Sequence, residues 1–384
     1  MLALCAAVAL AAAPAFPHAA GVTRGGLPLA VVSAPASPWA EVQLHVAIDA
    51  GELSPQERAR LGELVNALAA SVDLAAVGGS ARARVAPDHL VASWGAPAAQ
   101  LDVLLRGLHD ALVRHRALKT AATPVAAAVS SEADLDARAL ALALAGTPLS
   151  LPTQGPPQSD PLGPLAARVL RRERVAIAVV GPLPEAELLE RCARLLAAPL
   201  PPGAPVPRLA LAMPAGTRLA ESADPDVAGA RSVGWFLGPG RGTAGANPAN
   251  RAARAVLARL LSGRAEASPG AFAIAIDVTS ARAATIARAE GKVLQAFEGV
   301  ARSPPPADLV AAEVARERAA RLERLKDVGA LADALGRALV AGDAGLVDRE
   351  LDALAAITPD DVAAAARAAA LGPRVIWRVV GSTP

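Results

Sequence analysis

The hydrophobic pattern of this chain changes its period from one segment to the next. Residues 42–48 alternate apolar and polar side chains, which predicts a strand with one buried face and a polar face that carries His45. Residues 61–68 place leucine and valine three and four positions apart, which predicts an amphipathic helix. The remaining segments of this part are expected to be a strand region over 81–94, helices at about 98–114 and 124–144, a strand over 175–180 and a helix over 184–196.

The second part of the chain repeats this order of patterns. Thr358 followed by Pro359 is a strong helix start, because threonine caps a helix and proline fits its first turn. The predicted segments are strands at 232–237, 271–278 and 375–380, helices at 248–261 and 283–300, a pair of helices over 307–341, and a helix from Pro359 onward.

Two nearly identical stretches show how the repeat is built. Residues 174–181 read RVAIAVVG, and residues 374–381 read RVIWRVVG, 200 positions later (374 − 174 = 200). A β-branched run that recurs at about the length of a domain indicates two copies of one unit. We therefore predict an α+β fold of two tandem homologous domains, each an antiparallel sheet covered by helices on one face.

The expected domain boundaries follow from the proline content and from the first residues. Proline recurs between 199 and 208, which predicts a stiff linker between a first domain at 21–198 and a second at 209–384. Residues 1–20 hold an apolar run too short to span a bilayer stably and end in small residues, so we expect a secretory signal peptide. The protein is accordingly expected to be exported, to a bacterial periplasm or outside the cell. The alternative for these residues is a buried N-terminal helix.

Composition narrows the range of functions. The 384 residues carry a formal net charge of +2 with 19% charged side chains, which gives no bias toward nucleic acid. We expect no transmembrane segment, because no apolar run is long enough. Cys5 lies in the expected signal peptide, so no intrachain disulfide is expected, and Cys192 fits a packed thiol on a helix. The chain contains no tyrosine, so no phenol is available for catalysis.

Several short phrases occur in an order that is typical of one group of peptidases. Gly26-Leu27 opens the first strand, Gly51 follows the second, Gly78-Gly79 precedes the next, each half closes with Val-Val-Gly, and ITPDDV precedes the last helix. In this order and spacing the chain resembles the insulinase/pitrilysin family of zinc peptidases, the inverzincins, over nearly everything after residue 20. The resemblance implies a duplicated α+β fold and, in active members, a zinc site on the first long helix.

The catalytic motif of that family is H-x-x-E-H. Its two histidines share one helical face and bind Zn²⁺, while the glutamate activates the metal-bound water. Aligned on the hydrophobic face of the helix at 61–68, Glu63 and Ala67 occupy the histidine positions and Asn66 occupies the glutamate position. An amide cannot accept the proton, and none of the five histidines pairs with another at i, i+4 spacing. Glu132, where the third ligand is expected, is interpreted as a remnant or as a solvated helix residue, so we expect no metal and no cofactor.

The second domain of active relatives supplies an arginine and a tyrosine that polarise the scissile carbonyl. By resemblance, Arg264 stands in the place of the arginine and Phe272 in the place of the tyrosine. Because the phenol is absent, this clamp is expected to be broken together with the zinc site. The sequence therefore predicts no catalytic residues.

One feature of the family does not depend on catalytic side chains. In active relatives the strand after the Gly-Gly turn is an exposed edge that pairs with extended peptide, and its match here is Arg82, Ala83, Arg84 and Val85. Backbone pairing alone would let this edge bind a peptide. The alternative is that the two arginines protect an exposed edge against aggregation. The sequence favours neither.

Two further candidate sites are rejected. Asp88 and His89, with Ser93 nearby, suggest a hydrolase dyad, but adjacent strand residues point to opposite faces and no nucleophile elbow is present. His89 is thus expected to be a surface histidine. The glycine-rich segment 238–242 lacks the lysine of a phosphate-binding loop.

These observations predict a catalytically inactive member of the insulinase family. Such a protein is expected to bind an extended peptide or to be the non-catalytic partner of an active zinc-peptidase subunit. Two alternatives remain, an active metallopeptidase with an unrecognised site and a purely structural scaffold subunit.

Overall fold

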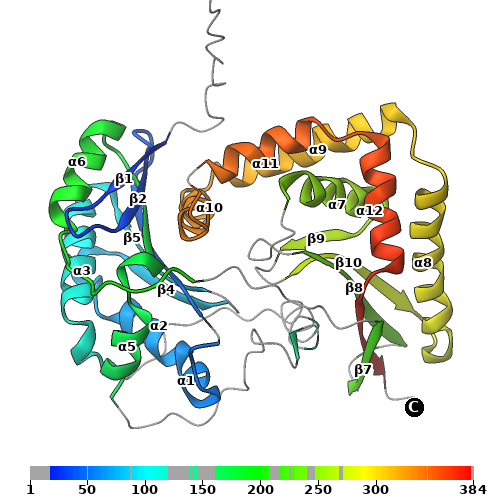
Figure 1. Cartoon of the computed structure of the whole chain (residues 1–384), viewed down its shortest axis with the longest axis horizontal. Helices are drawn as coiled ribbons and strands as arrows, with labels where there is room; N and C mark the ends of the chain where they lie inside the picture. The colour runs from blue at the N-terminus through cyan, green and yellow to red at the C-terminus, as the bar shows by residue number, and fades with distance from the viewer. Residues whose placement is uncertain are drawn as a thin grey trace, which may run out of the picture.

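The protein consists of two α+β halves that lie side by side, as a computed structural model shows (Figure 1). The predicted α+β class with two domains is confirmed. The structure describes residues 18–49, 51–86, 89–119, 139, 142, 144–145, 161–206, 216–224, 227, 229–239, 247–267, 271–343 and 345–381.

The first half is built on a six-stranded sheet. The strands are β1 (Ala19–Val22), β2 (Pro28–Ser33), β3 (Trp39–Ala47), β4 (Ser80–Val85), β5 (His89–Pro97) and β6 (Val175–Gly181). Their order is β1-β2-β6-β3-β5-β4, and all neighbours are antiparallel except β2 and β6, which are parallel. The strand region expected at 81–94 is therefore two antiparallel strands, β4 and β5.

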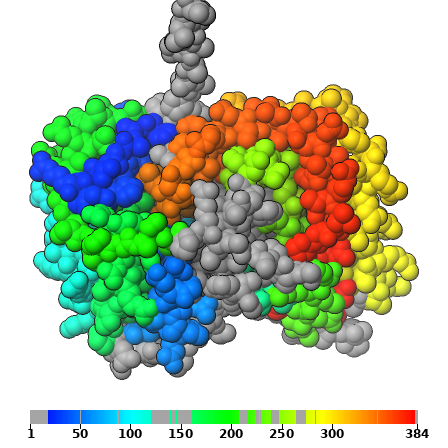
Figure 2. Space-filling view, in the orientation of Figure 1, coloured from blue at the N-terminus to red at the C-terminus, as the bar shows by residue number. Residues whose placement is uncertain are grey.

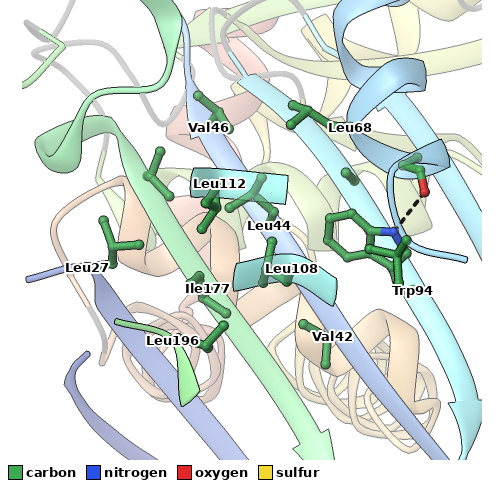
Figure 3. Close-up of a cluster of buried hydrophobic side chains, with 14 of the residues drawn as sticks. Leu27, Val42, Leu44, Val46, Leu68, Trp94, Leu108, Leu112, Ile177 and Leu196 are labelled. Atoms are coloured by element: carbon green, nitrogen blue, oxygen red, sulfur yellow. Dashed lines mark hydrogen bonds between the residues drawn. The ribbon is translucent and has the colours of Figure 1, made fainter. Parts of the chain in front are cut away.

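The helices and the sheet of the first half together enclose a continuous apolar core. The helices are α1 (Pro55–Ala59), α2 (Leu61–Ala70), α3 (Leu101–Val113), α5 (Gly163–Val169) and α6 (Glu185–Leu195). Alternate residues of the central strands, among them Val42, Leu44 and Ile177, meet leucines of these helices (Figure 3). Trp94 of β5 is fully buried there, and its Nε1 donates a hydrogen bond to the carbonyl oxygen of Ala69 in α2 at 2.9 Å.

The second half repeats this arrangement with five strands. They are β7 (Thr217–Asp224), β8 (Ala230–Pro239), β9 (Arg264–Ala267), β10 (Ala271–Ser280) and β11 (Arg374–Gly381), in the order β7-β11-β8-β10-β9. The two stretches that mark the sequence repeat form β6 and β11. Each pairs parallel with the strand on one side and antiparallel with the strand on the other, so the two strands take equivalent places in their sheets.

The helices of the second half follow the predicted pattern with one addition. They are α7 (Pro248–Leu260), α8 (Ile286–Arg302), α9 (Ala307–Arg324), α10 (Val328–Val340), α11 (Leu346–Ala355) and α12 (Pro359–Leu371). The helix start at Thr358 is confirmed, since its hydroxyl accepts a hydrogen bond from the backbone N–H of Asp361 at 3.3 Å. The sequence pattern did not predict α11, β7 or β9. No helix in the described ranges is long and apolar enough to cross a membrane.

Helix α10 belongs to the second half by sequence but packs on the sheet of the first. It contacts β2, β3 and β6, and in Figure 2 its orange surface lies beside the blue surface of the first strands. The apolar side of α10 packs on Val32 and Val180 of the sheet through Leu331, Ala332 and Leu335. The first sheet is therefore covered on both faces, which corrects the prediction of helices on one face only.

The second sheet receives a reciprocal contact from the first half. Ala139 is fully buried against Trp235 and Val375, and the carbonyl oxygens of Leu142 and Ala145 accept hydrogen bonds from the guanidinium of Arg218 in β7 at 2.9 and 2.7 Å. Each half thus places one segment on the sheet of the other. Most of the helix expected at 124–144 lies outside the described residues.

The proline-rich segment that follows α6 packs on the first half. Its described residues, up to residue 206, form no helix or strand. Leu200 is buried, and the carbonyl oxygen of Ala204 accepts a hydrogen bond from Nε of Arg174 at 3.0 Å. The domain boundaries at 198 and 209 remain predictions.

The close contact between α10 and β3 leads to a stability prediction. A Cβ on Gly336 would lie 2.1 Å from Cδ2 of His45, which is fully buried and held by its neighbours. We expect Gly336→Ala to lower the free energy of unfolding, measured by urea denaturation, by about 1–3 kcal/mol, the usual cost of overpacking.

Gly299→Ala is the matched control on α8. No atom lies within 4 Å of the Cβ that this substitution would add. Replacing a helical glycine by alanine should there raise the free energy of unfolding by about 0.5–1 kcal/mol. If both variants shift stability in the same direction, α10 does not pack on His45 as described.

Candidate functional site

The residues that the resemblance aligns with the zinc motif lie on α2, which packs against β4 and β5. One side of this helix packs into the core of the first half through Leu64, Val65 and Leu68. Glu63, Asn66 and Ala67 are three and four positions apart, so they share a helical face. The helix places the three positions together as the alignment requires.

The side chains at these positions do not form a metal centre. Glu63 is engaged by Nε of Arg60 at 3.1 Å. The Oδ1 atom of Asn66 is buried without a hydrogen-bond partner among the described residues, and Ala67 is 5% exposed. One carboxylate already held by arginine, one amide and one methyl group offer neither two imidazoles nor a general base.

A wider search of the structure adds no metal-binding cluster. No group of three or more His, Cys, Asp or Glu side chains that could hold a metal ion occurs in the described ranges. Glu132, the candidate for the third ligand, lies outside the described residues. The absence of zinc thus remains a proposal that rests on the residue types at the motif.

Strand β4 runs beside the motif helix and forms one edge of the first sheet. No strand in the described part of the chain pairs with its outer side. The backbone N–H of Ala86 donates to the carbonyl oxygen of His89 at 2.8 Å, which makes this a hydrogen-bonded pair of the antiparallel ladder. Hydrogen-bonded and non-hydrogen-bonded pairs alternate, so Ala81, Ala83 and Val85 turn their N–H and C=O groups to the open side.

The two arginines of β4 face helix α10. The guanidinium of Arg84 forms an ion pair with Asp333, which also binds Arg337 of the same helix. Arg82 lies close enough to Glu41 of β3 to act on its pKa. The second half of the chain therefore holds Arg84 of this edge while the backbone of its outer side stays open.

Next to this edge, three polar side chains of β3 form a row beneath α10: Glu41, Gln43 and His45. Burial raises the pKa of Glu41, whereas a hydrogen bond from Gln43 and the charge of Arg82 act in the opposite direction. Nε2 of Gln43 also donates to the carbonyl oxygen of Gly329 at 2.9 Å, across the boundary between the halves. This hydrogen bond ties the first turn of α10 to the polar face of β3.

Two histidines that the sequence places at the surface are buried in and beside this row. His45 is 0% exposed and His89 is 4% exposed, and their rings stack with centroids 6.3 Å apart. Both expectations, a polar solvent face for His45 and a surface position for His89, are wrong because α10 covers this face of the sheet. Nearly parallel rings do not direct nitrogen lone pairs at one point, so the pair is unsuited to share a metal ion. Nε2 of His45 is 3.1 Å from Oε1 of Gln43.

The second-half positions lie on the β9–β10 pair. Arg264 is opposite Ala275, and Ala267 is opposite Phe272, so the two positions stand at opposite ends of this pairing. Strand β9 is the edge of its sheet, as β4 is of the first. The side chains of Arg264 and Phe272 lie outside the described part of the structure.

Cys192 is a buried free thiol, as predicted. It is fully enclosed in the first core, and burial raises its pKa to about 12. A thiol that stays protonated at neutral pH is a poor nucleophile and a poor metal ligand. Cys192 therefore contributes to packing alone.

Solved structures show which fold this is. A chain titled as a protease from Helicobacter pylori superposes with a TM-score of 0.69 at 12% identity, covering 94% of this chain and 99% of that chain. A chain of complex III2 from Candida albicans reaches 0.71 at 15% identity, with 94% and 95% covered. A peptidase M16 inactive domain from Pseudomonas fluorescens reaches 0.66 at 16% identity, with 96% and 100% covered. The chain has an M16-like, or insulinase-like, fold.

Sequence comparison adds no closer relative. No protein-family model and no curated protein matches the chain. At identities of 12–16% the structural likeness shows the fold alone. Three of the phrases that carried the resemblance lie at strand boundaries of this fold: Gly26-Leu27 precedes β2, Gly51 follows β3 and Gly78-Gly79 precedes β4.

Sequence reasoning missed the polar row beneath α10. Alternation along β3 correctly separated its two faces, but it could not reveal that a helix from nearly 300 residues further on covers the polar one. The one local signal was Gly336, since a glycine inside a helical pattern indicates a close approach of another group.

The burial of His45 predicts a pH dependence of stability. Burial and the neighbouring charges of His89, Arg337 and Arg84 hold its pKa well below 6.5. Below about pH 6.5 the unfolded chain binds a proton that the folded chain does not, so the free energy of unfolding falls as pH falls, by up to about 1.4 kcal/mol per pH unit.

The test compares wild type with His45→Gln in urea unfolding from pH 7 to pH 5. The wild-type free energy of unfolding should fall relative to that of the variant as the pH decreases. Glu41 is present in both proteins, so its opposite contribution largely cancels in the comparison. Parallel pH curves would show that His45 does not titrate differently in the folded state.

Proposed function

We propose that this chain is a non-catalytic M16-like protein that binds an extended peptide along the outer edge of β4, at Arg82, Ala83, Arg84 and Val85. The observation that carries the proposal is the combination of an open edge with a motif helix that lacks both imidazoles and the general base. The edge offers backbone pairing, and the helix beside it offers no chemistry for cleavage.

The absence of catalysis rests on residue types. Glu63, Asn66 and Ala67 replace the motif, and no tyrosine exists anywhere in the chain to polarise a scissile carbonyl. Arg264 and Phe272 stay candidates for the remnant of that clamp. We accordingly propose that the protein needs no metal ion or cofactor.

Peptide binding is supported by the geometry of β4. Its open-side N–H and C=O groups come from Ala81, Ala83 and Val85. Arg84 is bound to Asp333, so its side chain is ordered beside the edge. The alternative function of the arginines, to deter aggregation at a bare edge, predicts the same charges but no peptide binding.

A non-catalytic subunit in a larger assembly is the second candidate. The observation that favours it is that similar folds occur in a chain titled as a peptidase M16 inactive domain and in a chain of complex III2. We propose an active zinc-peptidase subunit as the partner, and a purely structural scaffold as the remaining alternative. A stable partner whose binding survives substitution of both Arg82 and Arg84 would favour the scaffold.

Export stays part of the proposal, with a refinement of the signal peptide. Ala19 and Ala20 pair with Val31 and Ala30 in the β1–β2 ladder. Cleavage after residue 20 would remove half of β1, so cleavage before Ala19 fits the strand better. N-terminal sequencing of the exported protein decides between them, and an uncleaved cytoplasmic product would overturn export.

Peptide pairing is tested by removing one open-side N–H. Ala83→Pro deletes a donor that faces away from β5, and proline is tolerated on an edge strand at such a position. With fluorescein-labelled, reduced and carboxymethylated lactalbumin as the probe, we expect affinity to fall by about tenfold in fluorescence anisotropy.

Ala83→Val is the matched control, because it changes the side chain but keeps the N–H. It should bind the probe as wild type does, and both variants should keep the wild-type circular dichroism spectrum. Peptide binding along β4 is refuted if wild type does not bind the probe or if Ala83→Pro binds it as tightly as wild type.

Catalytic inactivity is tested by metal analysis and by proteolysis of the same probe. The purified protein, loaded with excess zinc and desalted, should retain no stoichiometric zinc and should leave the probe uncut. Chelator-sensitive cleavage that Glu63→Ala abolishes would establish the active-peptidase alternative instead.

A further inference from the structure

A cavity of about 220 Å³ lies between the second sheet and helix α8, away from β4 and the motif helix. It is larger than cavities of about 150 Å³ that hold benzene in engineered proteins. Its walls are mostly apolar. They come from β8, β10 and β11 on one side and from α8 on the other, with Phe236, Ile276, Ile376, Val293 and Leu294 as the larger apolar side chains.

The cavity exists because two glycines face it. Gly234 of β8 and Gly291 of α8 line opposite walls and contribute no side chain. A Cβ on Gly291 would meet no atom within 4 Å, and one on Gly234 would make only ordinary contacts, at 3.5 Å from Phe236. Neither glycine is required by backbone conformation, since both φ angles lie outside the left-handed region.

The equivalent region of the first half is closed by a helix. There α6 packs over β1 and β2. In the described part of the second half no helix packs over β7, and Leu219 of this strand is 52% exposed beside the cavity. The register places Leu219 opposite Ile376, so the exposed apolar surface continues into the cavity wall.

Polar groups stand at the two ends of the cavity. At one end the hydroxyl of Ser232, a residue 1% exposed, is buried and has no hydrogen-bond partner among the described residues. Arg378 stands next to it in the register and is bound by both carboxylate oxygens of Glu290, at 2.9 and 2.6 Å. That guanidinium is therefore neutralised within the protein.

Arg374 stands at the other end, next to Thr217 and Phe236. Its Nε donates to the hydroxyl of Thr217 at 2.6 Å, and no carboxylate in the described residues pairs with it. A partly buried guanidinium beside an apolar cavity is a ready partner for an anion, because its remaining donors form charge-assisted hydrogen bonds.

We propose that this cavity binds a small amphipathic carboxylate, whose aliphatic or single-ring body lies between Gly234 and Gly291 and whose carboxylate binds Arg374. The buried hydroxyl of Ser232 at the far end is then available to a polar substituent on the ligand. The site is separate from β4, so the proposal does not depend on peptide binding.

The test uses octanoate as the probe and isothermal titration calorimetry on the full chain. Gly291→Leu places a side chain in the cavity and should weaken octanoate binding by about tenfold or more. Gly299→Leu is the matched control, because it adds the same side chain to an exposed glycine of α8 that does not line the cavity. It should leave octanoate affinity within about twofold of wild type.

A second pair of measurements tests the anionic end. Arg374→Met keeps an apolar stem but removes the charge, and it should weaken octanoate about tenfold while leaving octanol affinity unchanged. The cavity proposal is overturned if octanoate does not bind or if Gly291→Leu binds it as wild type does. The carboxylate assignment is overturned if octanol binds wild type as tightly as octanoate does.

Discussion

The packing of α10 across the first sheet is the contact on which the arrangement of the two halves depends. Leucines of the helix bury the apolar part of the sheet face, and Gln43 in the polar row from Glu41 to His45 donates a hydrogen bond to the helix backbone at Gly329. Gly336 allows the close approach over His45. Without this helix, the first sheet would expose a wide face and its two buried histidines to water. The contact of Ala139 with the second sheet also holds the two halves together, so each half completes the fold of the other.

The same helix shapes the candidate peptide edge. Asp333 of α10 holds Arg84, and burial beneath the helix alters the pKa of Glu41 near Arg82. Because Arg84 is held in place, its side chain loses less entropy when a peptide pairs with this edge. The motif helix lies on the other face, where Ala81 and Ala83 pack toward the core. Strand β4, the proposed peptide edge, therefore lies beside α2, which carries the residues aligned with the zinc motif.

Much of the fold could be predicted because its signals are local. A period-two run located β3, a β-branched run located β6, the cap at Thr358 located α12, and the repeat of RVAIAVVG as RVIWRVVG pointed to equivalent strands in two sheets. The helix at 61–68 was predicted, and it carries Glu63, Asn66 and Ala67, which the resemblance aligns with the zinc motif. The misses have different causes. β9 has four residues, too few for a pattern to stand out. The roles of His45 and His89 depended on a contact between distant segments.

By itself, the sequence determined the periodic elements, the duplication and the residue types at the positions aligned with the zinc motif, since each of these depends on residue type and spacing along one segment. Only the tertiary structure decided which faces are buried. It placed α10 of one half on the sheet of the other, buried two histidines that alternation assigned to solvent, and left Gly234 and Gly291 facing each other across a cavity. The physical reason is that a face is buried only when a second surface packs against it. A strand pattern shows that a face is polar or apolar, but what covers that face is set by chain segments that the pattern does not contain.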